Sequence, residues 1–328
     1  MMNSRTRPMA VAKKLRILAA VTACVLSLSQ CTGDSSGKDR EPTGKGYRSP
    51  RAATPAPGLE RVIAEYTAGF GEDTGYRHPS RRDRETVAKG VALLLDGRRE
   101  EAENRLADVD FALRTVTDEA TGRRYAEVAD RSEGGAAPRG WGRVYLDLGS
   151  PARWTVQVPH PVADRNTERL GARLLGRAPG GVLIVAGAHR KAGRGDEADV
   201  AHRRDSVFHA VCAELARRGL PGVQLHGMAD DSAPDHDVVA STGRGSEGRP
   251  EARALAAALR KRGYDVCRAW ARSCPLEGRT NVQGRAAAAH DVSFLHVEFG
   301  PRLRGRPADA TETVNALTEV VRGWGRRR

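Results

Sequence analysis

Between residues 141 and 328, short apolar runs alternate with longer segments whose apolar residues recur every three or four positions. The runs are GRVYLDL, WTVQVPH, GGVLIVAGAH, LPGVQLHGM, YDVCRAW and SFLHVEFG. The longer segments are NTERLGARLLGR, SVFHAVCAELARRG, PEARALAAALRKRG and TETVNALTEVVRGW. Strands that alternate with helices of this length form a mostly parallel or mixed sheet with helices on both faces. We therefore predict an α/β domain over residues 141–328.

Residues 58–140 follow a different pattern. Two helical segments, GLERVIAEYTAGF and RETVAKGVALLLDGRREEAENRLADV, precede the stretch DFALRTVTDEATGRRYAEVADRS. This stretch predicts two alternating strands around a turn at Thr121 and Gly122. The order predicts a small α+β region, and the loop SEGGAAPRG marks its boundary with the α/β domain.

The first 31 residues have the organisation of an export signal. A basic start without acids leads into an apolar stretch over residues 15–28, which is shorter than the roughly 20 residues of a membrane-spanning helix. Cys31 ends this stretch and Cys24 lies within it. Both contexts resemble a bacterial lipobox, in which the cysteine is acylated, for example with palmitate. We expect an exported protein held on the outer face of the cell membrane by a lipid at Cys31.

Two alternatives stay open for this segment. Gln30 departs from the small residue that usually precedes the acylated cysteine, whereas Ala23 fits that position and makes Cys24 the alternative. A signal without a lipid, either cleaved or kept as an uncleaved anchor, is the second alternative. Residues 32–57 are rich in Gly, Ser, Pro and charged residues, so they cannot bury enough apolar surface to fold. We predict a disordered tether there.

The formal net charge of +13 is dispersed along the chain. Aromatic residues make up only 5% of the sequence and do not alternate with basic runs. Stacking on aromatic side chains and a concentrated basic patch are the usual signs of nucleic-acid binding, so we do not expect a nucleic-acid partner.

The cysteines further along the chain indicate a disulfide and no thiolate metal site. Cys267 and Cys274 are seven residues apart, which suits a local disulfide in the oxidising compartment that the export signal predicts. Cys212 lies in a helical pattern and is expected to be a buried apolar residue. The sequence contains no C-x-x-C.

Histidines follow several of the predicted strands. His160 follows WTVQVP, His189 follows LIVAGA, His226 follows GVQL, and His296 alternates with Glu298 in FLHVEF. Ligands of open α/β sheets bind at the carboxyl ends of the strands. We therefore expect a functional site built from these histidines.

Their chemistry points to a metal. His160 and Asp164 lie on one short loop, and His226 comes from a later strand. Two histidines and one carboxylate are a common ligand set of catalytic zinc, with a separate carboxylate as the base. Glu298 is the candidate for that base, and Glu168 is an alternative acid ligand on the following helix.

The segments VPHPVADRNTE, LIVAGAHR, VQLHGM and FLHVEFGPRLR resemble the motif series of a group of zinc-dependent amidohydrolases. The group includes N-formylglutamate amidohydrolases and phage-type poly-γ-glutamate hydrolases, and it is related in fold to zinc carboxypeptidases. The resemblance covers about residues 150–305. It implies that His160, Asp164 and His226 bind zinc and that Glu298 is catalytic. The first acid of the group is usually Glu, so Glu168 stays open as the acid ligand.

A substrate of such an enzyme carries a carboxylate, which suits the fork of an arginine guanidinium. The candidate substrate-binding residues are His189, Arg190, Arg279 and Asn281.

Two functions follow from these features. The first is an exported zinc-dependent hydrolase that cleaves an amide bond in an N-acyl amino acid, an envelope peptide or a poly-γ-glutamate-like substrate. The alternative is a non-catalytic envelope lipoprotein that binds a peptide-like ligand on the same scaffold.

Overall fold

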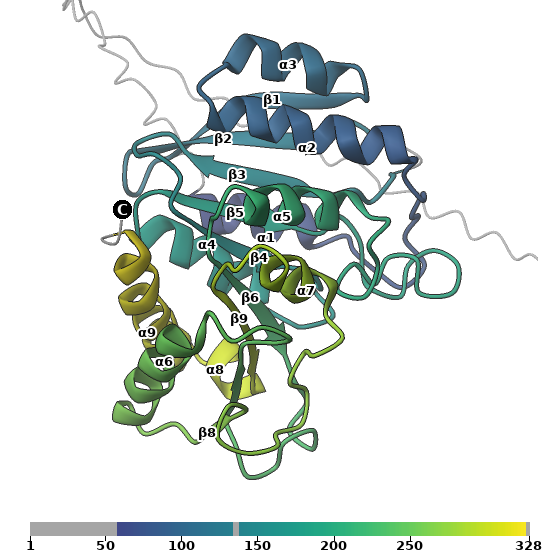
Figure 1. Ribbon diagram of the computed structural model, residues 1–328. Coiled ribbons are helices and arrows are strands. Elements are labelled where there is room, and N and C mark those ends of the chain that lie inside the picture. The colour runs from purple at the N-terminus through teal and green to yellow at the C-terminus, as the bar shows by residue number, and fades with distance from the viewer. Residues whose placement is uncertain (1–57, 134–137, 326–328) are drawn as a thin grey trace, which may run out of the picture. The chain divides into compact units, whose positions relative to one another are not determined.

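A nine-stranded sheet forms the centre of the fold, in the order β1-β2-β3-β5-β4-β6-β9-β7-β8 (Figure 1). The computed structural model describes residues 58–133 and 138–325. The strands are β1 (Phe111–Asp118), β2 (Arg123–Asp130), β3 (Arg143–Asp147), β4 (Trp154–Val158), β5 (Gly181–Val185), β6 (Gly222–Gly227), β7 (Val238–Ser241), β8 (Val266–Arg268) and β9 (Phe294–Phe299).

The sheet is mixed. Strands β5, β4, β6 and β9 are parallel to one another, as the alternation of strands and helices predicts. On one side, β1, β2 and β3 join β5 in antiparallel pairs. On the other side, β7 is antiparallel to β9 and parallel to β8. The predicted α/β class is confirmed.

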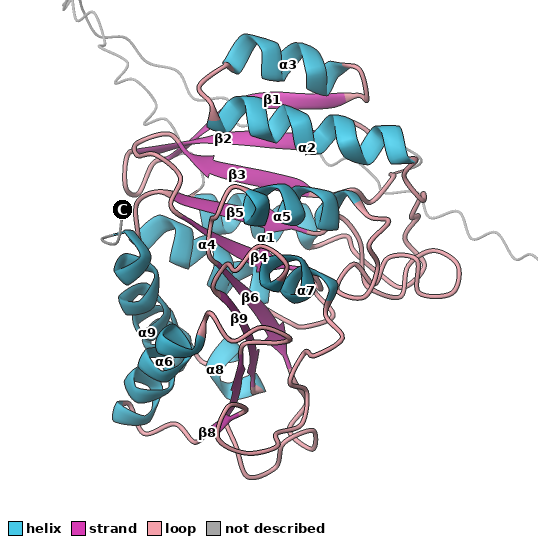
Figure 2. Cartoon of the chain, viewed as in Figure 1, coloured by secondary structure: helices cyan, strands magenta, loops and turns pink. Residues whose placement is uncertain are grey.

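Helices cover both faces of the sheet (Figure 2). One apolar core contains residues of α1, α4, α6 and α9, and the other contains residues of α2, α3 and α5. Helix α7 packs against α5. The helices are α1 (Leu59–Thr67), α2 (Arg81–Leu95), α3 (Arg99–Ala107), α4 (Thr167–Arg177), α5 (Val207–Arg217), α6 (Arg249–Lys261), α7 (Val282–Ala288), α8 (Pro301–Gly305) and α9 (Pro307–Gly325).

The central strands β4, β6 and β9 have one apolar and one polar face. Their apolar residues, such as Val223 and Leu225 of β6, belong to the core beneath α1, α4, α6 and α9. The alternate positions of β6 are Gln224 and His226, which are also buried. Because side chains alternate along a strand, the polar residues of these three strands share the opposite face. That face carries the histidines of the predicted site.

The region over residues 58–140 contributes to the same sheet. Its two strands form the predicted hairpin, with Gly122 at φ +68° in the turn, and β2 then pairs with β3. Residues 58–140 and 141–328 thus share one continuous sheet. The second predicted helical segment divides into α2 and α3, because Gly97 takes φ +75° after α2 ends.

The structure adds a strand that the sequence analysis did not predict. Strand β7 has only four residues and lies between polar loops, so its apolar run is too short to stand out. It lies between β9 and β8 and extends the sheet on that side.

The cysteines lie as the spacing predicts. Cys267 of β8 forms a disulfide with Cys274, and their Cα atoms are 6.0 Å apart. Cys212 is a buried free thiol in α5.

The predicted signal segment, the acylation at Cys31 or Cys24 and the tether over residues 32–57 all lie outside the described residues. Within residues 58–133 and 138–325, none of the helices has both the length and the apolar character needed to cross a membrane.

The core between the sheet and α4 can be tested with a matched pair of leucines. Leu174 of α4 is 0% exposed, whereas Leu148 is 38% exposed. We expect Leu174→Ala to lower the free energy of unfolding by about 2–5 kcal/mol, since it leaves a cavity, and Leu148→Ala to change it by less than about 0.5 kcal/mol. Urea unfolding of both variants measures the difference, and equal losses would contradict this core.

Candidate metal centre

A tight turn after β4 brings His160 and Asp164 together. The N–H of Asp164 donates to the carbonyl of His160 at 2.9 Å, and the N–H of Ala163 donates to the carbonyl of Pro161 at 2.8 Å. Val162 lies between Pro161 and Ala163 and has φ +68°, which is a strained conformation for a β-branched residue. The turn places Nδ1 of His160 3.2 Å from Oδ2 of Asp164.

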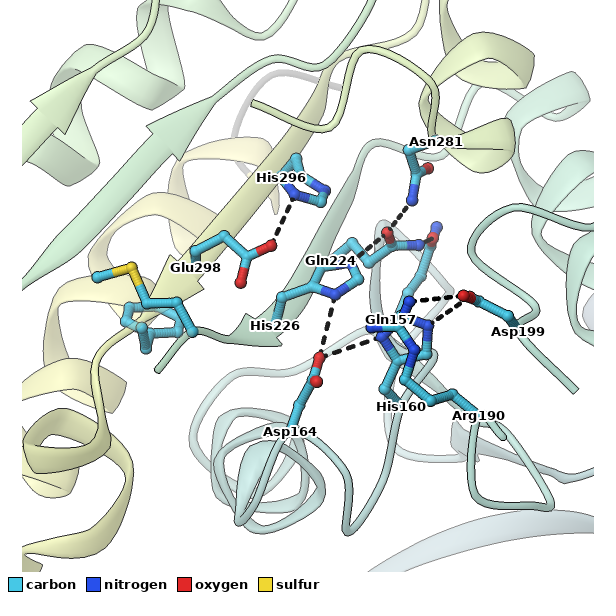
Figure 3. A network of polar contacts seen from close by, with 12 residues as sticks. Gln157, His160, Asp164, Arg190, Asp199, Gln224, His226, Asn281, His296 and Glu298 are labelled. Carbon is cyan, nitrogen blue, oxygen red and sulfur yellow. Dashed lines mark hydrogen bonds and ion pairs between the residues drawn. The ribbon is translucent and has the colours of Figure 1, made fainter. Parts of the chain in front are cut away.

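The third member comes from β6, the strand next to β4. Nδ1 of His226 lies 3.1 Å from the same carboxylate oxygen, Oδ2 of Asp164 (Figure 3). One nitrogen of each histidine and one oxygen of Asp164 all lie within 4.8 Å of one another, and all three residues are buried. This is the only such group among the residues that the structure describes.

The other nitrogen of each imidazole faces an acceptor. Nε2 of His160 lies 2.8 Å from Oδ1 of Asp199, whose second oxygen accepts from Arg190 at 2.5 Å. Nε2 of His226 lies 2.8 Å from Oε1 of Gln224. Asp199 and Gln224 thus hold the two imidazole rings with Nδ1 directed toward Asp164. Supporting residues orient metal-ligating histidines in the same way.

The pKa shifts differ between the three residues. Burial raises the pKa of Asp164, but its close contacts with the imidazoles of His160 and His226 outweigh burial and hold that pKa well below its usual range. Burial lowers the pKa of His226, more than its contact with Asp164 raises it. Burial also lowers the pKa of His160, but hydrogen bonds to Asp164 and Asp199 outweigh this and raise it. An ionised carboxylate and a neutral His226 are the forms that bind a metal, whereas the raised pKa of His160 favours its protonated form, which competes with a metal.

The residues present fit a metal ion. Two imidazole nitrogens and a carboxylate oxygen match a catalytic zinc site with three protein ligands. Bonds of about 2.1 Å in a tetrahedral site separate the ligand atoms by roughly 3.4 Å, close to the 3.1 and 3.2 Å found between the histidine nitrogens and Asp164.

Glu298 lies next to this group without belonging to it. It pairs with His226 across β6 and β9, and its Oε1 is 3.2 Å from Nε2 of His296. Burial raises the pKa of Glu298, but the neighbouring imidazoles of His226 and His296 outweigh it, so the pKa is lowered. Glu298 is therefore an ionised carboxylate beside the candidate ligands.

Arg304 of α8 connects the segments that carry the site. Its guanidinium donates to the carbonyls of Phe299, Met228 and Arg165, at 2.9, 3.0 and 2.7 Å. Each carbonyl lies one or two residues after Glu298, His226 or Asp164. A Cβ atom at Gly227 would lie 2.6 Å from Cζ of Arg304, so this approach requires glycine.

Glu168, the alternative acid ligand, lies outside the three-residue group. It is buried in the first turn of α4, and its Oε2 has no hydrogen-bond partner in the described part of the chain. Burial raises its pKa, although backbone hydrogen bonds from Val162 and Asn166 oppose the shift. Of the two acids, the structure brings Asp164 to the histidines.

The four expected substrate-binding residues have different positions. Asn281 is 1% exposed and its amide donates to Gln224, so it supports the centre instead of facing a substrate. Arg190 donates to Asp199. Arg279 is exposed and pairs with Glu277. His189 is half-buried outside the group, and its Nδ1 accepts from the N–H of Lys191 at 3.3 Å.

The sequence motifs assign no role in the centre to Asp199, Gln224 and Arg304. The sequence does contain a pattern that indicates the position of Gln224. In GVQLHG, the apolar Val223 and Leu225 alternate with the polar Gln224 and His226. That alternation places Gln224 on the face of His226. Asp199 and Arg304 come from a loop and a short helix, whose positions no local pattern specifies.

No protein-family model and no curated protein matches the sequence. Among solved structures, the N-formylglutamate amidohydrolase of Ralstonia eutropha JMP134 is 15% identical and aligns over 57% of this chain and 99% of its own, with a TM-score of 0.40. A bacteriophage poly-γ-glutamate hydrolase is 14% identical over 59% and 94% of the two chains, with a TM-score of 0.37. The succinylglutamate desuccinylase of Chromobacterium violaceum is 14% identical over 66% and 74%, with a TM-score of 0.38.

The similarity concerns the fold. The first two proteins belong to the group that the sequence motifs resemble.

The contact between Gly227 and Arg304 generates a test. We expect Gly227→Ala to lower the melting temperature, because the new methyl group displaces a guanidinium that three carbonyls hold. Gly176→Ala in α4 is the matched control, since nothing lies within 4 Å of its Cβ and alanine favours a helix by roughly 0.5–1 kcal/mol. Thermal unfolding compares the two, and a Gly227→Ala protein as stable as the control would contradict the role of Arg304.

Proposed function

We propose that this protein is an exported, zinc-dependent hydrolase that cleaves an amide bond. The observation that carries the proposal is the convergence of His160, Asp164 and His226 on one buried point, with Glu298 beside them. Burying an ionised carboxylate together with two imidazoles has a desolvation cost. A cation bound between the three residues would offset that cost.

Zinc suits this set of two nitrogens and one oxygen better than magnesium or calcium, which prefer oxygen ligands. Held by His160, Asp164 and His226, it would supply a Lewis acid that polarises the scissile carbonyl and makes water more acidic.

The chain's own residues would handle the protons. Glu298 is ionised and so can accept a proton from the attacking water and pass it to the departing amine. The C–N bond breaks, a C–O bond forms, and the proton of the water ends on the amine. His296 hydrogen-bonds to Glu298 and orients it, and Asp199 orients His160 in the same way.

The proposed substrates share an amide close to a carboxylate: an N-acyl amino acid, an envelope peptide or a poly-γ-glutamate-like polymer. This part of the proposal rests on the motif resemblance. Arg279 has an exposed guanidinium, and His189 is half-buried in the loop that follows β5. Both are proposed contacts for the substrate.

The proposed place of action is the outer face of the cell membrane. The basic and apolar start of the chain supports export, with a lipid at Cys31 or Cys24 as the anchor. The Cys267–Cys274 disulfide fits an oxidising compartment. An enzyme placed there would meet envelope or extracellular polymers.

Zinc binding tests the centre directly. We expect the purified protein to bind one equivalent of zinc at the centre and to melt at a higher temperature with it, since a ligand at 100 times its Kd adds about 2.7 kcal/mol of stability. His160→Ala should remove both effects, and His290→Ala, which changes an exposed histidine, should remove neither. The proposal fails if wild type binds no zinc, or if zinc stabilises wild type and His160→Ala equally.

Glu298→Gln separates hydrolysis from binding. We expect this variant to keep its zinc affinity and to lose activity by roughly 10²–10⁴-fold, as for loss of a general acid–base group. The assay follows amine release from N-acyl glutamates, peptidoglycan peptides and poly-γ-glutamate. A wild-type protein that binds zinc and these ligands but cleaves none of them would support the non-catalytic envelope lipoprotein instead.

The raised pKa of His160 predicts how zinc affinity depends on pH. Below that pKa, His160 carries a proton that competes with the metal, and above it the competition ends. Because the pKa lies above the ordinary value of about 6.5, zinc affinity should rise as the pH is raised from about 6.5 upward, and binding should release a proton. Calorimetry in two buffers of different ionisation enthalpy measures this release. An affinity that does not change over this range would contradict the assignment.

A further inference from the structure

Gln224 lies at the centre of a buried set of amides behind the candidate ligands. It is 0% exposed and lies on the same face of β6 as His226. Its Nε2 donates to Oε1 of Gln157 at 3.1 Å and to Oε1 of Gln283 at 3.3 Å. Its Oε1 faces Nε2 of His226 at 2.8 Å and accepts from Nδ2 of Asn281 (Figure 3).

Two backbone groups decide which way these amides point. Gln283 donates to the carbonyl of Val200 at 2.8 Å; a carbonyl only accepts, so Oε1 of Gln283 is the atom that faces Gln224. Asn281 accepts from the N–H of Gly284 at 2.9 Å, which caps α7. An N–H only donates, so Nδ2 of Asn281 is the atom that faces Gln224.

The orientation of Gln224 follows from both partners. A flipped Gln224 would set its oxygen against the oxygen of Gln283 and its NH₂ against the NH₂ of Asn281. Neither partner can flip in response without losing its bond to the backbone. Oε1 of Gln224 is therefore held toward Nε2 of His226, where it accepts only from a protonated Nε2. The competing acceptor for the proton of His226 is Oδ2 of Asp164, which lies 3.1 Å from Nδ1 but also faces Nδ1 of His160 at 3.2 Å.

We propose that Gln224 is a positioning residue that keeps the proton of His226 on Nε2, with Gln283 and Asn281 fixing its orientation. The Nδ1 lone pair is then directed at Asp164 and His160, where the proposed zinc binds; in this respect the inference rests on the proposed function. His160 receives the equivalent support from a carboxylate, Asp199. For His226 the supporting acceptor is the neutral amide of Gln224. The N-terminus of α7 and the carbonyl of Val200 fix the orientation of that amide through Asn281 and Gln283.

Two substitutions at Gln224 separate this role from packing. Gln224→Glu keeps an acceptor opposite Nε2 of His226, although it loses the bonds to Gln157 and Gln283. Gln224→Leu keeps a similar volume but leaves Asp164 as the remaining acceptor for the proton of His226, so the proton should move to Nδ1. Gln157→Leu is the control: it makes the same change in a residue that touches Gln224 but is not anchored to the backbone by its amide.

The experiment measures the tautomer of His226 in the metal-free full-length protein with ¹⁵N-labelled histidine, by long-range ¹H–¹⁵N correlation, and zinc affinity by competition with a chelator. We expect a proton on Nε2 in wild type, Gln224→Glu and Gln157→Leu, and on Nδ1 in Gln224→Leu. Zinc affinity should fall roughly 10–100-fold in Gln224→Leu, as for other residues that orient a metal ligand, and should stay within about threefold of wild type in Gln224→Glu.

A proton on Nδ1 in wild type overturns the inference, as does a Gln224→Leu protein with the proton on Nε2 and unchanged zinc affinity. If Gln157→Leu moves the proton as well, loss of packing and not the anchored orientation is responsible, and the inference falls. Wild type that carries the proton on Nε2 but binds no zinc supports the tautomer assignment and refutes the proposed function, so the two failures are distinguishable.

Discussion

The candidate site depends on one buried contact: Oδ2 of Asp164 lies between Nδ1 of His160 and Nδ1 of His226. A buried carboxylate is unfavourable without partners, and here two imidazoles from different segments approach the same oxygen. The shifts in pKa express this arrangement, since Asp164 is held ionised while burial keeps His226 neutral. A cation between the three residues would satisfy all of them at once, and this is the physical basis of the metal proposal.

The surrounding fold holds that contact in place. The parallel strands β4 and β6 set the spacing of the two histidines, and the turn at Val162 returns the chain so that Asp164 reaches both. Arg304 ties the loops after these strands to the end of β9. The supporting polar residues form a layer on one face of the central strands, while the other face is an ordinary apolar core. The apolar face of the sheet thus stabilises the fold, and its polar face carries the residues of the candidate metal centre.

Much of the fold and part of the site were accessible from the sequence. The helical and apolar periods predict a mostly parallel or mixed sheet, and the rule that ligands bind at strand ends selects His160 and His226. The choice between Asp164 and Glu168 was not accessible, because it depends on a turn with a positive φ at a valine. Asn281 was expected to face a substrate, but α7 carries it into the interior. Such outcomes depend on tertiary packing, which short motifs do not encode.

We propose that His160, Asp164 and His226 together hold one metal ion. Diffraction data from crystals grown with zinc, collected on both sides of the zinc absorption edge, test it most directly. We expect a single strong anomalous peak at about 2.0–2.2 Å from Nδ1 of His160, Nδ1 of His226 and a carboxylate oxygen of Asp164. A zinc ion bound elsewhere in the chain, with no anomalous peak between these residues, would contradict it.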